Sequence, residues 1–222
     1  MTARSNAFPA RPVLCLVTDP AYGGPDALAA KVAAAVEGGV AMVQLRDKDM
    51  PAGRLYELAL KLRRATAGRA AFVVNDRLDI ALACGADGVQ LGEEALPVDA
   101  ARKVAGAGRL LIGRSVHSVE GAAAAQREGA DFLVVGTIFP TGSHPDAPPA
   151  GLSLLAGVRE AVRLPFLAIG GVDAGNAGQV MARGAAGAAV ISAILAQPDP
   201  RAAAQALMQA MAAALRSTGS VR

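Results

Sequence analysis

The chain has 222 residues, 53% of them hydrophobic, and a net charge of +3 from 22 basic and 19 acidic side chains. This length suits one domain with one large core. The chain has no tryptophan and only 3% aromatic residues, so it lacks the exposed rings on which single-stranded nucleic acids stack. No apolar stretch reaches membrane-spanning length. Cys15 and Cys84 lie in apolar runs without metal-ligand spacing. We therefore expect buried thiols in a soluble, cytoplasmic protein that binds neither nucleic acid nor membrane.

Short aliphatic runs alternate with Ala-rich helical patterns along the whole chain. We expect strands at 13–18, 42–46, 71–75, 88–91, 110–115, 132–136, 165–169 and 188–191. We expect helices at 26–37, 52–67, 78–84, 98–105, 119–128, 153–162, 176–183 and 201–215. Strands that are apolar on both faces and separated by helices indicate a parallel sheet covered by helices.

Four of the helix-to-strand junctions look alike, and each begins with a glycine. These are Gly39, Gly85, Gly129 and Gly184, spaced about two strand–helix units apart. Each glycine can end a helix in the left-handed conformation, and their placement before every second strand suits the layering of a barrel. The alternative, an open doubly wound sheet, usually carries a Gly-rich first loop that this chain lacks. We expect a single α/β domain, a (β/α)8 TIM barrel over residues 1–222, with flexible tails at 1–11 and 217–222.

Polar residues follow nearly every expected strand, and in a barrel the carboxyl ends of all strands meet at one mouth. Side chains alternate along the strand end at 44–48, so Gln44, Arg46 and Lys48 share one face. Two cations on one face suit a diphosphate, which Arg binds with two parallel hydrogen bonds and Lys as a point charge. The alternative is a solvated strand end with surface ion pairs.

Asn75, Asp76 and His117 are the next candidates in chain order. Asp76 is suited to Mg²⁺, which prefers carboxylate and phosphate oxygens, but an Asp here can equally cap the following helix. His117 is one of only two histidines and follows the fifth expected strand. It is a candidate acid–base group, with an ordinary hydrogen-bonded histidine as the alternative.

The last two strands end in a way that favours phosphate binding. Gly170 and Gly171 let backbone N–H groups approach an anion, and the junction of Ile191 and Ser192 can offer a helix N-terminus beside them. The loops after the seventh and eighth strands are the common phosphate site of such barrels, although a Gly-Gly pair often marks a plain turn. The longest loop, 140–149, is a candidate lid or a surface linker.

Six segments, in register from about residue 14 to residue 200, resemble motifs of the thiamine-phosphate synthase/TenI superfamily. They are 16–19 (LVTD), 43–48 (VQLRDK), 74–77 (VNDR), 86–92 (ADGVQLG), 113–118 (GRSVHS) and 168–172 (AIGGV). The resemblance implies one of two activities. Synthases join hydroxymethylpyrimidine diphosphate to hydroxyethylthiazole phosphate and release pyrophosphate with Mg²⁺, whereas TenI-type proteins tautomerise a thiazole carboxylate phosphate without a cofactor.

The synthase resemblance implies a role for each matching residue. Asp76 would bind Mg²⁺, and Ser115 would contact the departing diphosphate. The pyrimidine diphosphate would contact Gln44, Arg46, Lys48, Asn75, Ser115 and His144. The thiazole phosphate would contact Thr141, Ser143, Gly171, Ile191 and Ser192. Ser115, His117 and Lys48 are the candidate catalytic residues.

Two positions depart from the synthase pattern. Synthases usually read Gly-Gln-Glu-Asp after the fourth strand, and the Asp is a second Mg²⁺ ligand. Here the segment is 92–95 (GEEA), so that ligand is missing unless Glu93 or Glu94 reaches inward. Synthases also usually read Thr-x-Thr-Lys in the long loop. Here the segment is 141–144 (TGSH), so His144 stands in place of the Lys, a permanent cation. The segment 113–118 also looks more like the TenI branch.

Because most of the diphosphate and metal site is retained, we predict a synthase, a transferase of thiamine biosynthesis. Its substrates would be the phosphorylated thiazole and the pyrimidine diphosphate. One alternative is a TenI-type tautomerase, an isomerase in which His117 moves the proton. Another is a non-catalytic regulator that binds thiazole phosphate. The sequence leaves the oligomeric state open, and a homodimer is one possibility.

Overall fold

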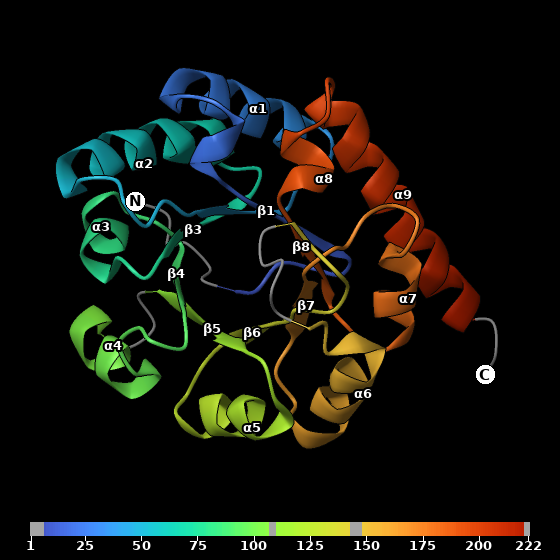
Figure 1. Ribbon diagram of the computed structural model, residues 1–222. Coiled ribbons are helices and arrows are strands. Elements are labelled where there is room, and N and C mark those ends of the chain that lie inside the picture. Colours follow the sequence, from blue (N-terminus) through green and yellow to red (C-terminus); the bar gives the residue numbers. More distant parts are fainter. Residues whose placement is uncertain (1–6, 107–109, 143–147, 220–222) are drawn as a thin grey trace.

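Eight parallel strands form a closed barrel surrounded by helices in the computed structural model, which describes residues 7–106, 110–142 and 148–219 (Figure 1). Neighbours along the chain pair in order, and β8 pairs with β1 to close the ring. The strands are β1 (Val13–Val17), β2 (Met42–Leu45), β3 (Ala71–Asn75), β4 (Gly88–Leu91), β5 (Leu111–Val116), β6 (Phe132–Val135), β7 (Phe166–Ile169) and β8 (Gly187–Val190). The predicted TIM barrel is confirmed.

The helices lie outside the barrel, as Figure 1 shows in a view along its axis. They are η1 (Pro20–Tyr22), α1 (Pro25–Glu37), α2 (Ala52–Thr66), α3 (Leu78–Ala83), α4 (Val98–Ala105), α5 (Val119–Arg127), α6 (Gly151–Ala161), α7 (Ala177–Ala182), α8 (Ser192–Leu195) and α9 (Pro200–Gly219). Within the described ranges, none of them combines the length and the apolar character needed to cross a bilayer.

Every expected strand is present with its ends displaced by at most one residue, and the eight expected helices are present as well. Helix ends differ by at most two residues, except that α9 continues to residue 219. Two short elements, η1 and α8, were not expected, because three or four residues are too few to show a helical period.

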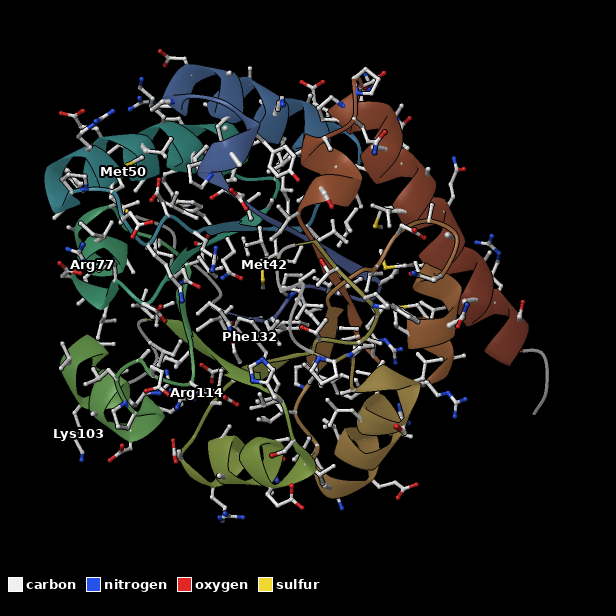
Figure 2. The ribbon with its side chains drawn as sticks, in the orientation of Figure 1. Met42, Met50, Arg77, Lys103, Arg114 and Phe132 are labelled. Atoms are coloured by element: carbon white, nitrogen blue, oxygen red, sulfur yellow. The ribbon has the colours of Figure 1, made fainter. Side chains whose placement is uncertain are left out.

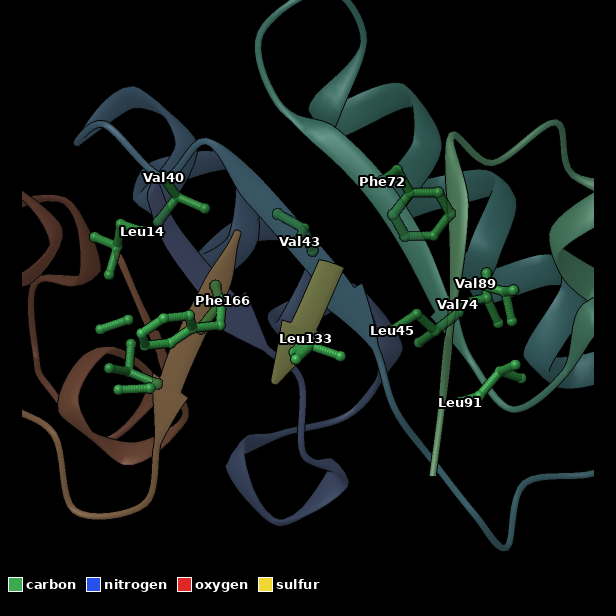
Figure 3. Close-up of a cluster of buried hydrophobic side chains, with 14 of the residues drawn as sticks. Leu14, Val40, Val43, Leu45, Phe72, Val74, Val89, Leu91, Leu133 and Phe166 are labelled. Atoms are coloured by element: carbon green, nitrogen blue, oxygen red, sulfur yellow. The ribbon is translucent and has the colours of Figure 1, made fainter. Parts of the chain in front are cut away.

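Alternation along the strands separates two cores. Side chains that point outward pack against the helices and include Leu14, Val43 and Val74 (Figure 3). Side chains that point inward fill the barrel and include Met42 and Phe132, near the centre of the view in Figure 2. Burial of an aliphatic or aromatic side chain contributes about 1.5–3 kcal/mol. Burial on both faces explains why the strands are continuously apolar in the sequence.

The recurring junctions have a structural explanation. The four junction glycines adopt positive φ values between 64 and 109°, as predicted. At two junctions an Asp follows: Asp87 accepts the backbone N–H of Phe72 at 2.8 Å and pairs with Arg63 of α2 at 3.1 Å. Asp131 likewise accepts an N–H of β5 at 2.7 Å and pairs with Arg102 of α4 at 2.6 Å. At these two junctions the Asp therefore ties the strand start to its neighbour and to a helix, at the end of the barrel opposite the mouth.

Packing reaches into the segments expected to be tails. The ring of Phe8 lies 5.3 Å from that of Phe132 and packs against the inner core, although residue 8 falls in the expected tail 1–11. Helix α9 passes residue 217, where the other tail was expected to begin. Residues 1–6 and 220–222 lie outside the described residues.

Both cysteines are buried and free, as predicted. Cys15 points into the barrel interior, where complete burial raises the pKa of its thiol to about 12. The thiol therefore stays neutral and serves as a small apolar side chain.

Candidate active site

The carboxyl ends of the strands surround a cavity of about 560 Å³. Its lining brings together the predicted residues Gln44, Arg46, Lys48, Asn75, Asp76, Ser115, His117, Thr141, Gly171, Ile191 and Ser192. The lining includes residues from all eight strand ends and their loops, although they are scattered over the chain. Ser143 and His144 lie outside the described residues, as does much of the candidate lid. The contacts expected of both residues, and the closure of that lid, stay predictions.

A chain of hydrogen bonds runs across the ends of β2, β3 and β4. Gln44 Nε2 donates to Asn75 Oδ1 at 2.8 Å, and Asn75 Nδ2 donates to Asp76 Oδ2 at 2.8 Å. The backbone N–H of Gly92 donates to Asp76 Oδ1 at 2.7 Å. Each carboxylate oxygen therefore accepts one bond and keeps a second lone pair for another partner. The network fixes the carboxylate at the cavity wall.

The backbone of Asp76 is held in the left-handed region, with a φ of 56°; no other non-glycine residue in the described part of the chain has a positive φ. Its N–H donates to Gln90 O at 2.9 Å, which holds this conformation. The residue before α3 is Arg77, and no side chain caps that helix. The helix-capping alternative for Asp76 is therefore wrong, and its side chain is directed to the cavity instead.

The two cations of β2 lie on a strand end that Thr18 fastens. Thr18 is fully buried, and its Oγ1 accepts the N–H of Arg46 at 2.8 Å and donates to Arg46 O at 3.2 Å. Asp47 accepts the N–H groups that follow it and so closes the turn. Within the described residues neither Arg46 nor Lys48 forms an ion pair of the kind expected for the alternative, a solvated strand end with surface ion pairs. Both side chains line the cavity with their charge available to an anion.

The rim above β4 and β5 carries a histidine–carboxylate pair. His117 Nδ1 lies 2.9 Å from Glu93 Oε1, and the two side chains are 59% and 49% exposed. Arg114, labelled in Figure 2, fastens this rim by donating to Glu93 O at 2.9 Å. Of the two carboxylates in the departing motif, Glu93 lines the cavity and Glu94 is not part of its lining. A contact this exposed adds little stability.

Glycines and a short helix form the opposite side of the mouth. Gly170 and Gly171 have φ values of 96° and 63°, and Asn176 Nδ2 donates to Gly171 O at 2.8 Å. Helix α8 begins at Ser192 with no side-chain cap, so its first N–H groups have no partner within the helix. Lys31 of α1 donates to Leu195 O at 2.9 Å and holds the other end of α8.

Sequence reasoning did not predict the contacts that hold these groups in place. Thr18, Lys31 and Gln90 each bond to a cavity segment from another element. Gln90 is the clearest case, since its Nε2 donates to Ser115 Oγ at 3.0 Å from within the strand β4. The only sequence signal was a polar residue in an otherwise apolar strand.

Two cations and a fixed carboxylate on one side of a barrel mouth, facing a glycine turn and a helix start, define a TIM-barrel enzyme that acts on phosphorylated substrates. Known proteins identify its family. A family model described as thiamine monophosphate synthase matches residues 14–194. The chain belongs to the thiamine monophosphate synthase family, and the predicted superfamily resemblance is confirmed.

Individual relatives match over most of their length. The thiamine-phosphate synthase of Roseiflexus castenholzii is 45% identical over 203 residues, which is 90% of this chain and 89% of that protein. The thiamine-phosphate synthase of Methanospirillum hungatei is 50% identical over 170 residues, which is 76% of this chain and 82% of that protein. The thiamine phosphate pyrophosphorylase of Pyrococcus furiosus superposes with a TM-score of 0.84 at 40% identity, covering 91% of this chain and 96% of that one.

Proposed function

We propose that the protein is a thiamine-phosphate synthase, a transferase that couples hydroxymethylpyrimidine diphosphate to hydroxyethylthiazole phosphate and releases pyrophosphate. The observation that carries this proposal is the pair of cations, Arg46 and Lys48, in one cavity with the carboxylate of Asp76. The names of the relatives support the same transferase activity. A tautomerase that acts on a monophosphate has no evident use for this diphosphate side of the cavity.

The reaction breaks one C–O bond and forms one C–N bond. The methylene carbon of the pyrimidine loses the diphosphate, which leaves with the electron pair of the C–O bond. The thiazole nitrogen then donates its lone pair to that carbon. Arg46 and Lys48 stabilise the negative charge that develops on the diphosphate, and Ser115 donates a hydrogen bond to it. The protein contributes positioning and electrostatics, because the substrates carry the reactive atoms.

The residues of the cavity fit a Mg²⁺ ion that is held jointly with the substrate. Mg²⁺ commonly binds one or two carboxylates together with substrate phosphates, and Asp76 supplies a carboxylate with free lone pairs. No cluster of three metal-ligating side chains exists among the described residues, which suits an ion completed by the diphosphate. Glu93 lines the same cavity and is the candidate second carboxylate in place of the residue absent at Ala95. When bound, the ion would neutralise charge on the leaving diphosphate.

The opposite side of the mouth is suited to the phosphate of the thiazole. Gly171, Ser192 and Thr141 line the cavity there, with the start of α8 directed at it. A helix start and a glycine turn both present backbone N–H groups, which bind phosphate oxygens. With its phosphate held there, the thiazole ring would lie between this side and the diphosphate side, where its nitrogen can reach the pyrimidine carbon.

The experiment supplies purified protein with both substrates, with and without Mg²⁺, and measures pyrophosphate release. We expect Mg²⁺-dependent release in proportion to product. The variant Lys48→Gln should lower the rate by one to two decades, since a charge-assisted hydrogen bond contributes about 1.5–3 kcal/mol. Lys103→Gln changes the net charge equally on the outer surface of α4 and should keep the activity (Figure 2).

The same preparation tests the alternatives. Absence of pyrophosphate release would refute the synthase proposal. Exchange of thiazole carboxylate phosphate isomers, followed by NMR, would then support a tautomerase, and its loss in His117→Ala would assign the proton transfer to His117. Binding of thiazole phosphate without turnover in either assay would indicate a regulator.

A further inference from the structure

A buried glutamine lies next to Ser115 and is not part of the cavity lining. Gln90 is 1% exposed and points into the barrel from the strand β4. In the sheet it pairs with Asn75 on one side and with Gly113 on the other. An amide is an unusual filling beside an inner cluster built from Val, Leu, Met, Phe, Cys and Ala.

The neighbouring strand makes room for this amide. A Cβ at Gly113 would overlap Gln90 Oε1 and would come within 2.7 Å of Phe132 Cε2. Glycine inside a strand weakens the strand and often marks a close approach by another group. Here the approaching groups are the side chains of Gln90 and Phe132, so the glycine of β5 is matched to the amide of β4 and to the ring of β6.

Stability does not explain why this residue is a glutamine. Its Oε1 is the buried side-chain oxygen without a hydrogen-bond partner in the described part of the chain. A buried acceptor without a partner lowers stability, whereas an apolar side chain of the same size would not. The remaining contact of the amide is therefore the one to explain.

That contact sets the direction of the Ser115 hydroxyl. Gln90 Nε2 can only donate, and it donates to Ser115 Oγ at 3.0 Å. One lone pair of the oxygen is thereby occupied, so the hydroxyl proton has to point elsewhere. Ser115 lines the cavity, and its proton is free to point there. Accepting one hydrogen bond also strengthens the bond that the hydroxyl donates.

We propose that Gln90 is a positioning residue that fixes the Ser115 hydroxyl as a hydrogen-bond donor to the diphosphate. This inference rests on the proposed synthase function for its kinetic consequence. The underlying chemistry, donation to a diphosphate, is tested independently with inorganic pyrophosphate as the probe.

Two substitutions at this position separate the polarity of the amide from its size. Gln90→Met keeps the length and removes the donor. Gln90→Glu places an acceptor beside Ser115, so that its hydroxyl turns toward the carboxylate. We expect pyrophosphate affinity, measured by calorimetry, to fall about tenfold in the first variant and further in the second. The melting temperature of Gln90→Met should be unchanged or higher, because the unpartnered oxygen is gone.

Kinetics with both substrates completes the test. We expect kcat to fall about tenfold in Gln90→Met, while KM for the thiazole phosphate stays within about twofold. In a Ser115→Ala background the same substitution should lower kcat no further, because a positioning residue acts only through its partner. Thr66→Val is the matched control: Thr66 is also fully buried, but its hydroxyl bonds only to carbonyls of α2. It should lower the melting temperature and leave kcat unchanged.

The outcomes distinguish the two proposals. An equal loss of kcat from Gln90→Met with and without Ser115, or unchanged pyrophosphate affinity, would overturn the positioning role. A lower melting temperature together with proportional loss of every activity would also overturn it, by showing a purely structural role. A wild-type protein without turnover, but with pyrophosphate affinity that depends on Gln90, would refute the synthase function and retain the positioning role.

Discussion

Replacing Gly171 by alanine should disturb both the packing and the phosphate side of the mouth. Gly171 has a φ of 63°, and an added Cβ would overlap the carbonyl oxygen of Pro140 and lie 2.8 Å from Phe139 Cβ. The left-handed conformation costs an alanine about 1–2 kcal/mol. Overpacking against the neighbouring loop costs about 1–3 kcal/mol more. We therefore expect Gly171→Ala to lower the free energy of unfolding by about 2–5 kcal/mol.

Gly85 provides a matched control for the backbone contribution. Its φ is 64°, nearly the same as that of Gly171, but a Cβ there would meet nothing within 4 Å. Gly85→Ala should therefore lose only about 1–2 kcal/mol. Urea unfolding of the two variants measures the difference, which reports the close approach of the loop that carries Thr141.

Steady-state kinetics gives the second measurement on Gly171→Ala. Displacement of the loop after β6 should raise KM for the thiazole phosphate, while KM for the pyrimidine diphosphate stays close to its wild-type value. Equal losses of stability in Gly171→Ala and Gly85→Ala would refute the packing argument. An unchanged KM for the thiazole phosphate would remove this glycine from the phosphate site.

Asp76→Asn keeps a residue that tolerates the left-handed backbone and removes the charge, so pyrophosphate release should fall more than about tenfold and lose its Mg²⁺ dependence. A Mg²⁺ titration that matches the wild type would contradict the proposed ligand. Thr18→Val leaves the N–H of Arg46 without its partner and should cost about 1–3 kcal/mol in urea unfolding, with a higher KM for the pyrimidine diphosphate. Unchanged values would mean that the strand end is held by other contacts. Burial raises the pKa of Cys15 to about 12, above about 8.5 in the unfolded chain. The contribution of the neutral, buried thiol to the free energy of unfolding is therefore complete below about pH 8.5 and is lost as the pH rises toward 12. Cys15→Ala should flatten the alkaline decline in melting temperature, and an identical decline would assign it to other groups.

The fold could be predicted because its signals repeat. Each strand is apolar on both faces, each is followed by a helical pattern, and Gly39 and Gly85 begin junctions of the same kind. Elements too short to show a helical period were not predicted: η1 has three residues and α8 has four. Helix α9 runs past its expected end because an Ala-rich sequence carries no stop signal before residue 219.

The site could be predicted to the extent that it follows from topology. Parallel strands in a closed ring bring their carboxyl ends together, so polar residues at those ends face one cavity wherever they lie in the sequence. The supporting contacts do not follow from spacing. Thr18 meets Arg46 across 28 positions, and Lys31 meets Leu195 across 164. Whether Glu93 or its neighbour faces the cavity depends on a single step along a loop, which only the folded chain decides.

The walls of the mouth differ in polarity between its two halves. Strands β2 to β5 direct amides, a carboxylate and a hydroxyl inward at their carboxyl ends, whereas β6 to β8 present Val134, Ile169 and Ala189 there. These halves lie on opposite sides of the barrel axis (Figure 1). A leaving diphosphate gains from fixed donors and cations, and a flat heterocycle gains from small apolar walls and backbone N–H groups. In the proposed reaction the thiazole nitrogen bonds to the carbon that the diphosphate leaves, and this division across the axis would place the two substrates on either side of that carbon. The departure at Ala95 falls in the loop after β4, outside the strands that carry this arrangement.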